Sequence, residues 1–441
     1  MIKTLINAWK IIDLRKRILY TVMIIIVFRI GSMIPVPFLN VEALRGLMGN
    51  SAEGGALLAY LDTLSGGAFA QATLFAMSIT PYVNSSIIMQ LMGIALPVLE
   101  NLQKEGSEGQ KKINTITRYV TIALGLMQGA GYYLQLKNSS FEGQSVIKYT
   151  QGASGTFVFI IIVLIFTAGT ALIMWLGERI NEKGIGNGVS ILLFAGIVSR
   201  LPAIFTKLST FIMFAAMNPG ENWRYFVYVP IFLIILLGMM WIIVFINDAE
   251  RRIPVQYAQR TAGRRLYAGQ ISHIPLKVGL AGIMPVIFAS SILSMPTLIS
   301  LFTKPTGFFK KVLEALSING WLYAVIYFFL IIMFSYFYVS ISFEPLEMAN
   351  NLRQSNGVIP GIRPGKPTME FFDKILSKIT FLGAIFLAFI AIFPIVFGFL
   401  TGMSSLSLSG TSIVILVGVA LETIKQLESQ MMMRKYKGFL D

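Results

Sequence analysis

The sequence predicts an all-α membrane protein with ten transmembrane helices, and three observations support this fold class. Of the 441 residues, 55% are hydrophobic and only 13% are charged. Soluble domains carry roughly 25% charged residues, so about half of the usual charge is missing. The mean hydropathy is +0.71. The chain also contains ten mostly apolar stretches of roughly 20 residues, the length that a helix needs to cross a bilayer. A cytosolic enzyme, a disordered chain and a disulfide scaffold are therefore excluded.

The ten predicted spans are rich in isoleucine and phenylalanine, with scattered glycine and proline. We expect helices, because backbone exposed to lipid must satisfy its own hydrogen bonds. The short alternating strands of an outer-membrane barrel are not seen. The spans cover residues 18–37, 76–96, 116–136, 155–176, 188–206, 225–246, 278–302, 321–343, 379–400 and 411–428.

Lysine and arginine are distributed unevenly between the two sides of these spans. When a charge near the end of a span is counted with the neighbouring loop, the side with both termini carries 26 and the other side carries 9. Cytoplasmic loops hold the excess of positive charge, so both termini are expected in the cytoplasm. Arg29 remains inside a span, where it either caps carbonyl groups near Gly31 and Pro35 or helps to hold a closed state.

The layout predicts two halves of five spans each, residues 1–215 and 216–441. An odd number of spans gives the halves opposite orientations. This is the arrangement of an inverted repeat, and it places a transport pathway at the interface of the halves. The second half carries the two largest cytoplasmic loops, residues 247–277 and 344–378.

The spans lack the groups that catalysis or ion coupling needs. Glu178, Asp248, Glu344 and Glu422 lie at cytoplasmic ends, whereas ion-coupled transporters usually bury carboxylates at membrane depth. His273 has no second ligand at metal-binding spacing. The sequence contains no cysteine and no phosphate-binding loop. We therefore expect no enzyme activity, no cofactor and no metal. A secondary transporter for a small solute remains the alternative.

Residues 54–75 are helical in period but too short to span, and glycine pairs flank them. They form either a re-entrant helix inside the protein or an external helix at the membrane surface.

The two large loops are basic. Ile253, Val255 and Tyr257 alternate as in a strand or hairpin arm, and residues 358–367 contain the turn residues of a stiff projecting finger. Their charge either sets topology, binds the membrane surface, or forms a docking surface for an anionic partner such as ribosomal RNA or an acidic patch on a motor.

Short motifs follow one another along the whole chain, each weak alone but specific in this order. They include Phe28-Arg29-Ile30-Gly31, Ile34-Pro35-Val36-Pro37, Leu64-Ser65-Gly66-Gly67, Gly184-Ile185-Gly186-Asn187-Gly188, Arg251-Arg252-Ile253, Pro285-Val286-Ile287-Phe288 and Pro360-Gly361-Ile362-Arg363-Pro364-Gly365. With these motifs the chain closely resembles the SecY family of protein-conducting channels.

The resemblance implies a clamshell of two five-helix halves around an hourglass pore in the bacterial cytoplasmic membrane. Such a channel translocates unfolded secretory proteins and releases transmembrane segments sideways into the lipid. It has no catalysis of its own. Its expected partners are the SecE and SecG subunits, the SecA motor ATPase, the ribosome, signal peptides with their preproteins, and membrane lipids.

The resemblance also assigns site residues. The constriction ring is expected to consist of Ile79, Val83, Val189, Leu193, Ile287 and Ile415. The plug, a short helix at about residues 58–75, is expected to include Leu61, Asp62, Leu64, Ser65, Gly66 and Gly67. The lateral gate is expected at Ser86, Gln90, Ser290 and Ser291. Docking of cytosolic partners is expected at Arg251, Arg252, Arg260 and Arg363.

These residue types suit the implied roles. An aliphatic collar offers no hydrogen bonds to an ion and closes by dewetting. Ile79 and Val83 are four residues apart and so share a helix face. From spacing alone, however, such residues are ordinary helix-packing residues. The gate serines and glutamine either bond across the gate, at about 0.6 kcal/mol each, or simply let two helices pack closely.

Overall fold

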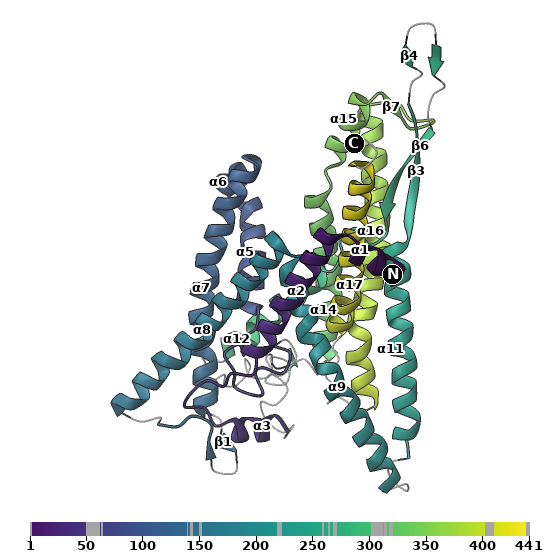
Figure 1. The fold of residues 1–441 in the computed structure, drawn as a ribbon. Coiled ribbons are helices and arrows are strands. Elements are labelled where there is room, and N and C mark those ends of the chain that lie inside the picture. Colours follow the sequence, from purple (N-terminus) through teal and green to yellow (C-terminus); the bar gives the residue numbers. More distant parts are fainter. Residues whose placement is uncertain are drawn as a thin grey trace.

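Long helices make up most of the chain in the computed structural model (Figure 1). The structure describes residues 2–49, 62, 65–138, 140–141, 144–149, 152–217, 223–257, 260–262, 265–267, 271–300, 312, 315–316, 321–401 and 410–437.

In the first part of the chain the helices are α1 (Ile2–Lys10), α2 (Ile12–Gly31), α3 (Val41–Gly49), α5 (Thr80–Ala95), α6 (Pro97–Lys104), α7 (Ser107–Asn138), α8 (Gly152–Lys183) and α9 (Gly188–Met217). Two short strands, β1 (Ser140–Phe141) and β2 (Gln144–Ser145), form a small hairpin between α7 and α8.

In the second part the helices are α11 (Tyr225–Asp248), α12 (Met284–Ser300), α14 (Trp321–Ser342), α15 (Pro345–Gln354), α16 (Lys366–Thr401) and α17 (Gly410–Lys437). The strands are β3 (Glu250–Tyr257), β4 (Arg260–Ala262), β5 (Arg265–Tyr267), β6 (Ile271–Lys277) and β7 (Gly357–Val358).

A helix lies over each of the ten predicted spans, although the ends differ. The helix of the first span, α2, already ends at Gly31, and α12 begins only at Met284. Among the described helices, six are long and apolar enough to cross a membrane. A seventh is added if α5 and α6, which are bent by 99° at Leu96, count as one span. The structure thus supports a membrane protein with several spans, and the number ten remains a prediction.

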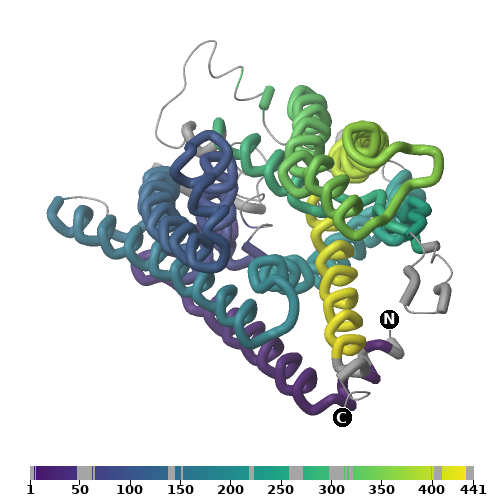
Figure 2. The backbone as a smooth tube through the Cα atoms, turned by 90° about the horizontal axis from the view of Figure 1, so that it is seen from above, coloured from purple at the N-terminus to yellow at the C-terminus, as the bar shows by residue number. Residues whose placement is uncertain are grey.

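The described helices pack around several hydrophobic cores. One core joins α7, α8 and the segment around Val36, and its large buried side chains include Phe166 and Leu136. Another core joins α11, α12, α14, α16 and α17 and includes Tyr327. A third cluster joins α2, α8, α9 and α17. Figure 2 shows α7 and α16 on opposite sides when the molecule is seen from above.

The basic loops fold into a small sheet of order β6-β3-β7. Strand β3 pairs antiparallel with β6, from Glu250 opposite Lys277 to Gln256 opposite Ile271, and its end pairs with β7. Ile253 and Val255 are buried, which confirms the predicted strand. The sheet joins the two large loops of the sequence. A further hairpin, β4–β5, projects beyond α15 (Figure 1); we call this side of the bundle the hairpin end.

Residues 65–79, here called the turn segment, are a succession of turns rather than a helix. The prediction of a helix is therefore wrong over residues 65–75. Gly66, Gly67 and Ala72 have positive φ angles, which a right-handed helix does not allow. Residues 51–61 and 63–64, the rest of the predicted plug, lie outside the described residues.

Candidate functional site

The six ring residues belong to one hydrophobic cluster, although they come from four parts of the chain. Ile79 and Ile415 are buried members of this cluster, at 2% and 4% exposure. The other four are half-buried and pack against it; they are Val83, Val189, Leu193 and Ile287. None of the six lies on the outer surface of the bundle as an exposed side chain. The structure therefore brings together what the sequence separates by more than 300 residues.

Local sequence explains how Ile79 and Val83 reach this place. Ile79 is the residue before α5, and Pro81 sits in the first turn of that helix, where its missing N–H costs nothing. Ser78 has a positive φ of 53°, so the chain turns sharply just before the helix. The Val83 amide donates to the Ile79 carbonyl oxygen at 3.0 Å. Both side chains thus lie on one face at the start of α5.

The start of α9 is fixed in a similar way. The Asn187 side chain accepts from the amides of Val189 and Ser190, at 3.1 and 3.4 Å, and so caps the helix. The Gly188 amide donates to Asn181 Oδ1 at 2.7 Å. A Cβ at Gly188 would clash with the carbonyl oxygen of Gly177 on α8, so only glycine allows this approach. This close packing positions Val189 and, one turn later, Leu193.

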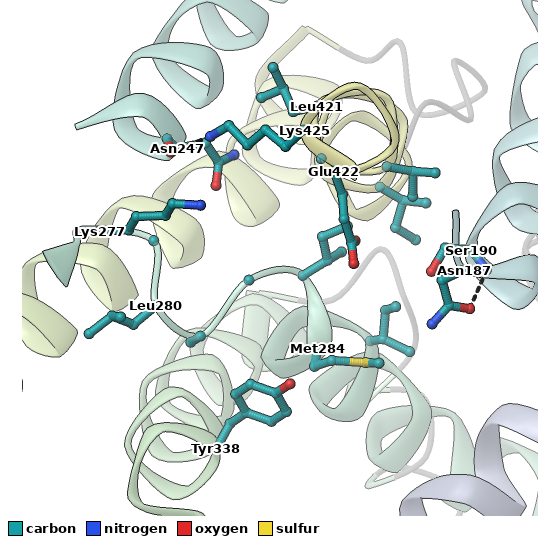
Figure 3. Close-up of a pocket in the computed structure, with 18 of the residues that line it drawn as sticks. Asn187, Ser190, Asn247, Lys277, Leu280, Met284, Tyr338, Leu421, Glu422 and Lys425 are labelled. Carbon is teal, nitrogen blue, oxygen red and sulfur yellow. Dashed lines mark hydrogen bonds between the residues drawn. The ribbon is translucent and has the colours of Figure 1, made fainter. Parts of the chain in front are cut away.

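A cavity of about 280 Å³ lies against one side of the cluster, towards the hairpin end (Figure 3). Leu193, Ile287 and Ile415 form part of its wall. Polar side chains such as Asn187 and Glu422 share the rest with apolar ones such as Leu280 and Met284 (Figure 3). The cavity thus has a mixed lining that includes three of the ring residues.

The turn segment contributes Ala68, Phe75 and Ile79 to the cluster itself. Along α9, the contacts of this segment fall at residues 196–200, whereas the ring residues are Val189 and Leu193. Since a helix rises about 1.5 Å per residue, these contacts lie roughly 5–10 Å beyond Leu193. On α9, the contacts of Gly66 therefore lie further along the helix than the residues that line the cavity.

Backbone hydrogen bonds attach the turn segment to the chain that follows α2. The Val36 amide donates to the Ala72 carbonyl at 2.8 Å, and the Leu74 amide donates to the Ile34 carbonyl at 2.9 Å. The ring of Phe75 stacks on Phe28 of α2, with centroids 5.6 Å apart. The conformation of the segment is thus set by tertiary contacts as well as by its own sequence.

An ion pair attaches this region to α9. Asp62 Oδ2 lies 2.8 Å from Arg200 Nη2, with side-chain exposures of 6% and 16%. The sequence does not single out Arg200, because it lies near the end of a predicted span and its charge is grouped with those of the following loop. Asp62, Ser65, Gly66 and Gly67 are all brought to this contact region, whereas Leu61 and Leu64 lie outside the described residues.

The predicted gate residues lie on α5 and α12. Ile87 of α5 belongs to the same hydrophobic core as Phe288 of α12. Ser290 is buried and donates to the carbonyl oxygen of Ile287 in its own helix, at 2.9 Å, and Ser291 accepts from Ser294. Within the described residues, no hydrogen bond joins Ser86 or Gln90 to these serines.

The predicted docking arginines lie at the hairpin end. Arg251 and Arg252 are exposed on β3, and Arg252 pairs with Glu250 at 2.6 Å. Arg363 is exposed in the turns before α16, where its carbonyl accepts from the Thr368 hydroxyl. Arg260 is on β4 of the projecting hairpin. The sheet thus places these basic residues on one side of the molecule.

Comparison with known proteins identifies the family. The SecY family model matches residues 73–424. The chain belongs to the SecY family. The protein translocase subunit SecY of Streptomyces coelicolor is 40% identical over 447 residues, covering 100% of both chains.

Solved structures agree on the fold. A protein-conducting channel aligns with a TM-score of 0.65 at 17% identity, covering 94% of this chain and 92% of that one. Sec61 in the canine ribosome–channel complex from the endoplasmic reticulum aligns with a TM-score of 0.62 at 16% identity, with the same coverage. The family is one of multi-pass membrane proteins of a translocase and not of enzymes.

Proposed function

We propose that this chain is the channel subunit of a protein translocase, passing unfolded secretory proteins across the cytoplasmic membrane and releasing transmembrane segments laterally. Its membership of the SecY family supports this function. The curated relatives are named translocase subunits, which argues against the alternative of a small-solute transporter.

One observation carries the proposal furthest. Six aliphatic side chains from distant parts of the chain converge in one cluster, which borders a cavity and includes residues of the turn segment. A narrow aliphatic collar excludes ions because they cannot replace their water there, yet it is indifferent to the side chains of a passing polypeptide. This combination suits a channel with varied cargo.

The remaining parts follow from the same function. The turn segment acts as the plug, and α5 with α12 forms the lateral gate. The ten spans form two inverted five-helix halves, with both termini in the cytoplasm. SecE and SecG complete the complex, and the arginines of the sheet and the Arg363 turn bind the SecA motor or a ribosome. The solved ribosome–channel complex of Sec61 supports the last point by analogy of fold.

Reconstitution tests the proposal. The chain is placed in liposomes with its partner subunits, the motor ATPase and a fluorescent preprotein. We expect ATP to make the preprotein resistant to external protease, and we expect no uptake of a folded, cross-linked preprotein. Transport of small solutes without any protection of the preprotein would refute the proposed function.

A further inference from the structure

The ion pair between Asp62 and Arg200 is largely shielded from solvent. The side-chain exposures are 6% for Asp62 and 16% for Arg200, and the charged atoms are 2.8 Å apart. Charged groups at membrane depth are expensive and are normally kept only where they are paired and have a function. This pair joins two parts of the chain that are about 140 residues apart in sequence.

The Asp62 carboxylate contacts both α9 and the turn segment. Its Oδ2 pairs with Arg200 on α9, while its Oδ1 accepts from the backbone amide of Ala70 in the turn segment at 2.7 Å. The Asp62 carbonyl oxygen also accepts from the Gly67 amide at 2.9 Å. The carboxylate is therefore a bridge between the fold of the turn segment and α9.

The backbone makes a second contact at the same place. The Ser199 hydroxyl lies within hydrogen-bond distance of two carbonyl oxygens, that of Gly196 in its own helix at 2.6 Å and that of Gly66 at 3.1 Å. A Cβ at Gly66 would lie 2.7 Å from Gly196 Cα, so the two chains touch backbone to backbone. Arg200, Ser199 and Gly196 thus form one docking face on α9 for the turn segment.

Arg200 depends on this docking. Its Nη1 is buried and has no hydrogen-bond partner within the described residues. If the turn segment moved away, the guanidinium group would lose the carboxylate that compensates its charge. Breaking a buried ion pair in this way is strongly unfavourable. Separation of Asp62 from Arg200 is therefore part of the work of displacing the segment.

We propose that the Asp62–Arg200 pair sets how strongly the turn segment is held against α9, and through this sets how strong a signal peptide must be to open the channel. The inference rests on the proposed function and adds a specificity determinant to it. Asp62 and Arg200 are positioning residues. They act on the closed state, because a signal peptide shifts the equilibrium only by its preference for the open one.

Accessibility of Ser199 measures the docking directly. The chain contains no cysteine, so Ser199→Cys supplies a single labelling site beneath the turn segment. We expect Asp62→Asn or Arg200→Gln to accelerate labelling by a polar maleimide on the order of tenfold or more, because the buried pair is lost. Arg200→Lys keeps the charge and should remain near the unmodified rate.

Two controls separate docking from general loosening. The Arg118–Glu178 pair has the same 2.8 Å separation but joins α7 to α8, so Glu178→Gln should leave labelling of Ser199→Cys unchanged. Ala388→Cys, fully buried in another core, should stay unlabelled in every variant. Equal acceleration of labelling at both cysteines would refute a local role of the ion pair in docking. Unchanged labelling of Ser199→Cys in both Asp62→Asn and Arg200→Gln would refute it as well.

Translocation then tests the specificity. The measured quantity is the ratio of transport of a preprotein with a defective signal to transport of one with an intact signal, in reconstituted vesicles. We expect Asp62→Asn and Arg200→Gln to raise this ratio several-fold. Glu178→Gln should not alter this ratio. An unchanged ratio despite faster labelling would refute the link to selection. If the unmodified chain did not transport the preprotein with an intact signal, the proposed function would fail. The labelling result would still show whether the Asp62–Arg200 pair holds the turn segment against α9.

Discussion

At the scale of single residues, a seal against ions depends on side chains that offer nothing to hydrogen-bond. The ring residues are aliphatic and pack in one hydrophobic cluster. The sequence alone leaves them as ordinary packing residues, and only the family resemblance singles them out. Arg200 shows the opposite case, because no local pattern pairs it with Asp62 and only the tertiary structure does.

A polar side chain in the ring should open it to water. Ile79→Asn or Ile287→Asn is expected to raise ion conductance in planar bilayers and to relax the requirement for a good signal peptide, because an amide wets the collar. Ile79→Val, which keeps the aliphatic character, should behave as the unmodified channel. Unchanged conductance in both asparagine variants would speak against the ring.

Alanine substitutions at two adjacent glycines distinguish the effect of a steric clash from that of backbone strain. Gly66 and Gly67 both have positive φ angles, so alanine costs roughly 1–2 kcal/mol at either position. A Cβ at Gly66 also meets Gly196, which adds about 1–3 kcal/mol, whereas a Cβ at Gly67 meets nothing within 4 Å. Gly66→Ala should therefore increase labelling of Ser199→Cys more than Gly67→Ala does. Equal effects would contradict the close approach.

At the scale of elements, the alternating pattern of β3 predicts its strand correctly, while the helical period of the turn segment does not predict its structure. Ile253 and Val255 are buried on one face, as alternation requires. In the turn segment, hydrogen bonds to Ile34 and Val36 and several positive φ angles replace the helix. Such long-range bonds leave no trace in the local period.

The sheet should depend on its buried face. Val255 is fully buried, so Val255→Asp places an unpaired carboxylate in the core of the loops and should cost about 3 kcal/mol or more. Limited trypsin digestion is expected to cut at the loop arginines much faster. Gln256→Asp, on the exposed face of the same strand, should digest at the original rate.

The Arg363 turn should matter for the motor and not for the fold. Arg363→Glu is expected to reduce ATP-driven transport strongly while the chain still inserts into the membrane, because the exposed side chain would then repel an acidic partner. Arg353→Glu, also exposed on the neighbouring α15, serves as the control. Normal transport by Arg363→Glu would remove the docking role.

At the scale of the whole molecule, the central claim is that one aliphatic waist lies on the path of the polypeptide. Hydropathy predicts where the helices lie, because apolar length is a local property of the sequence. It cannot show which helices meet, and the joining of α5, α9, α12 and α17 around one cluster is visible only in the structure. The cavity borders this cluster, and the turn segment contributes residues to it.

Cross-linking to an arrested preprotein tests this claim most directly. Single cysteines are placed in the cysteine-free chain at Val83, Leu193 and Ile287, and at Ile234, an aliphatic residue of α11 that is 69% exposed on the outer surface. We expect a cysteine in the stalled part of the preprotein to form disulfides with all three ring positions and none with Ile234→Cys. Disulfides with Ile234→Cys and none with the ring would contradict the account.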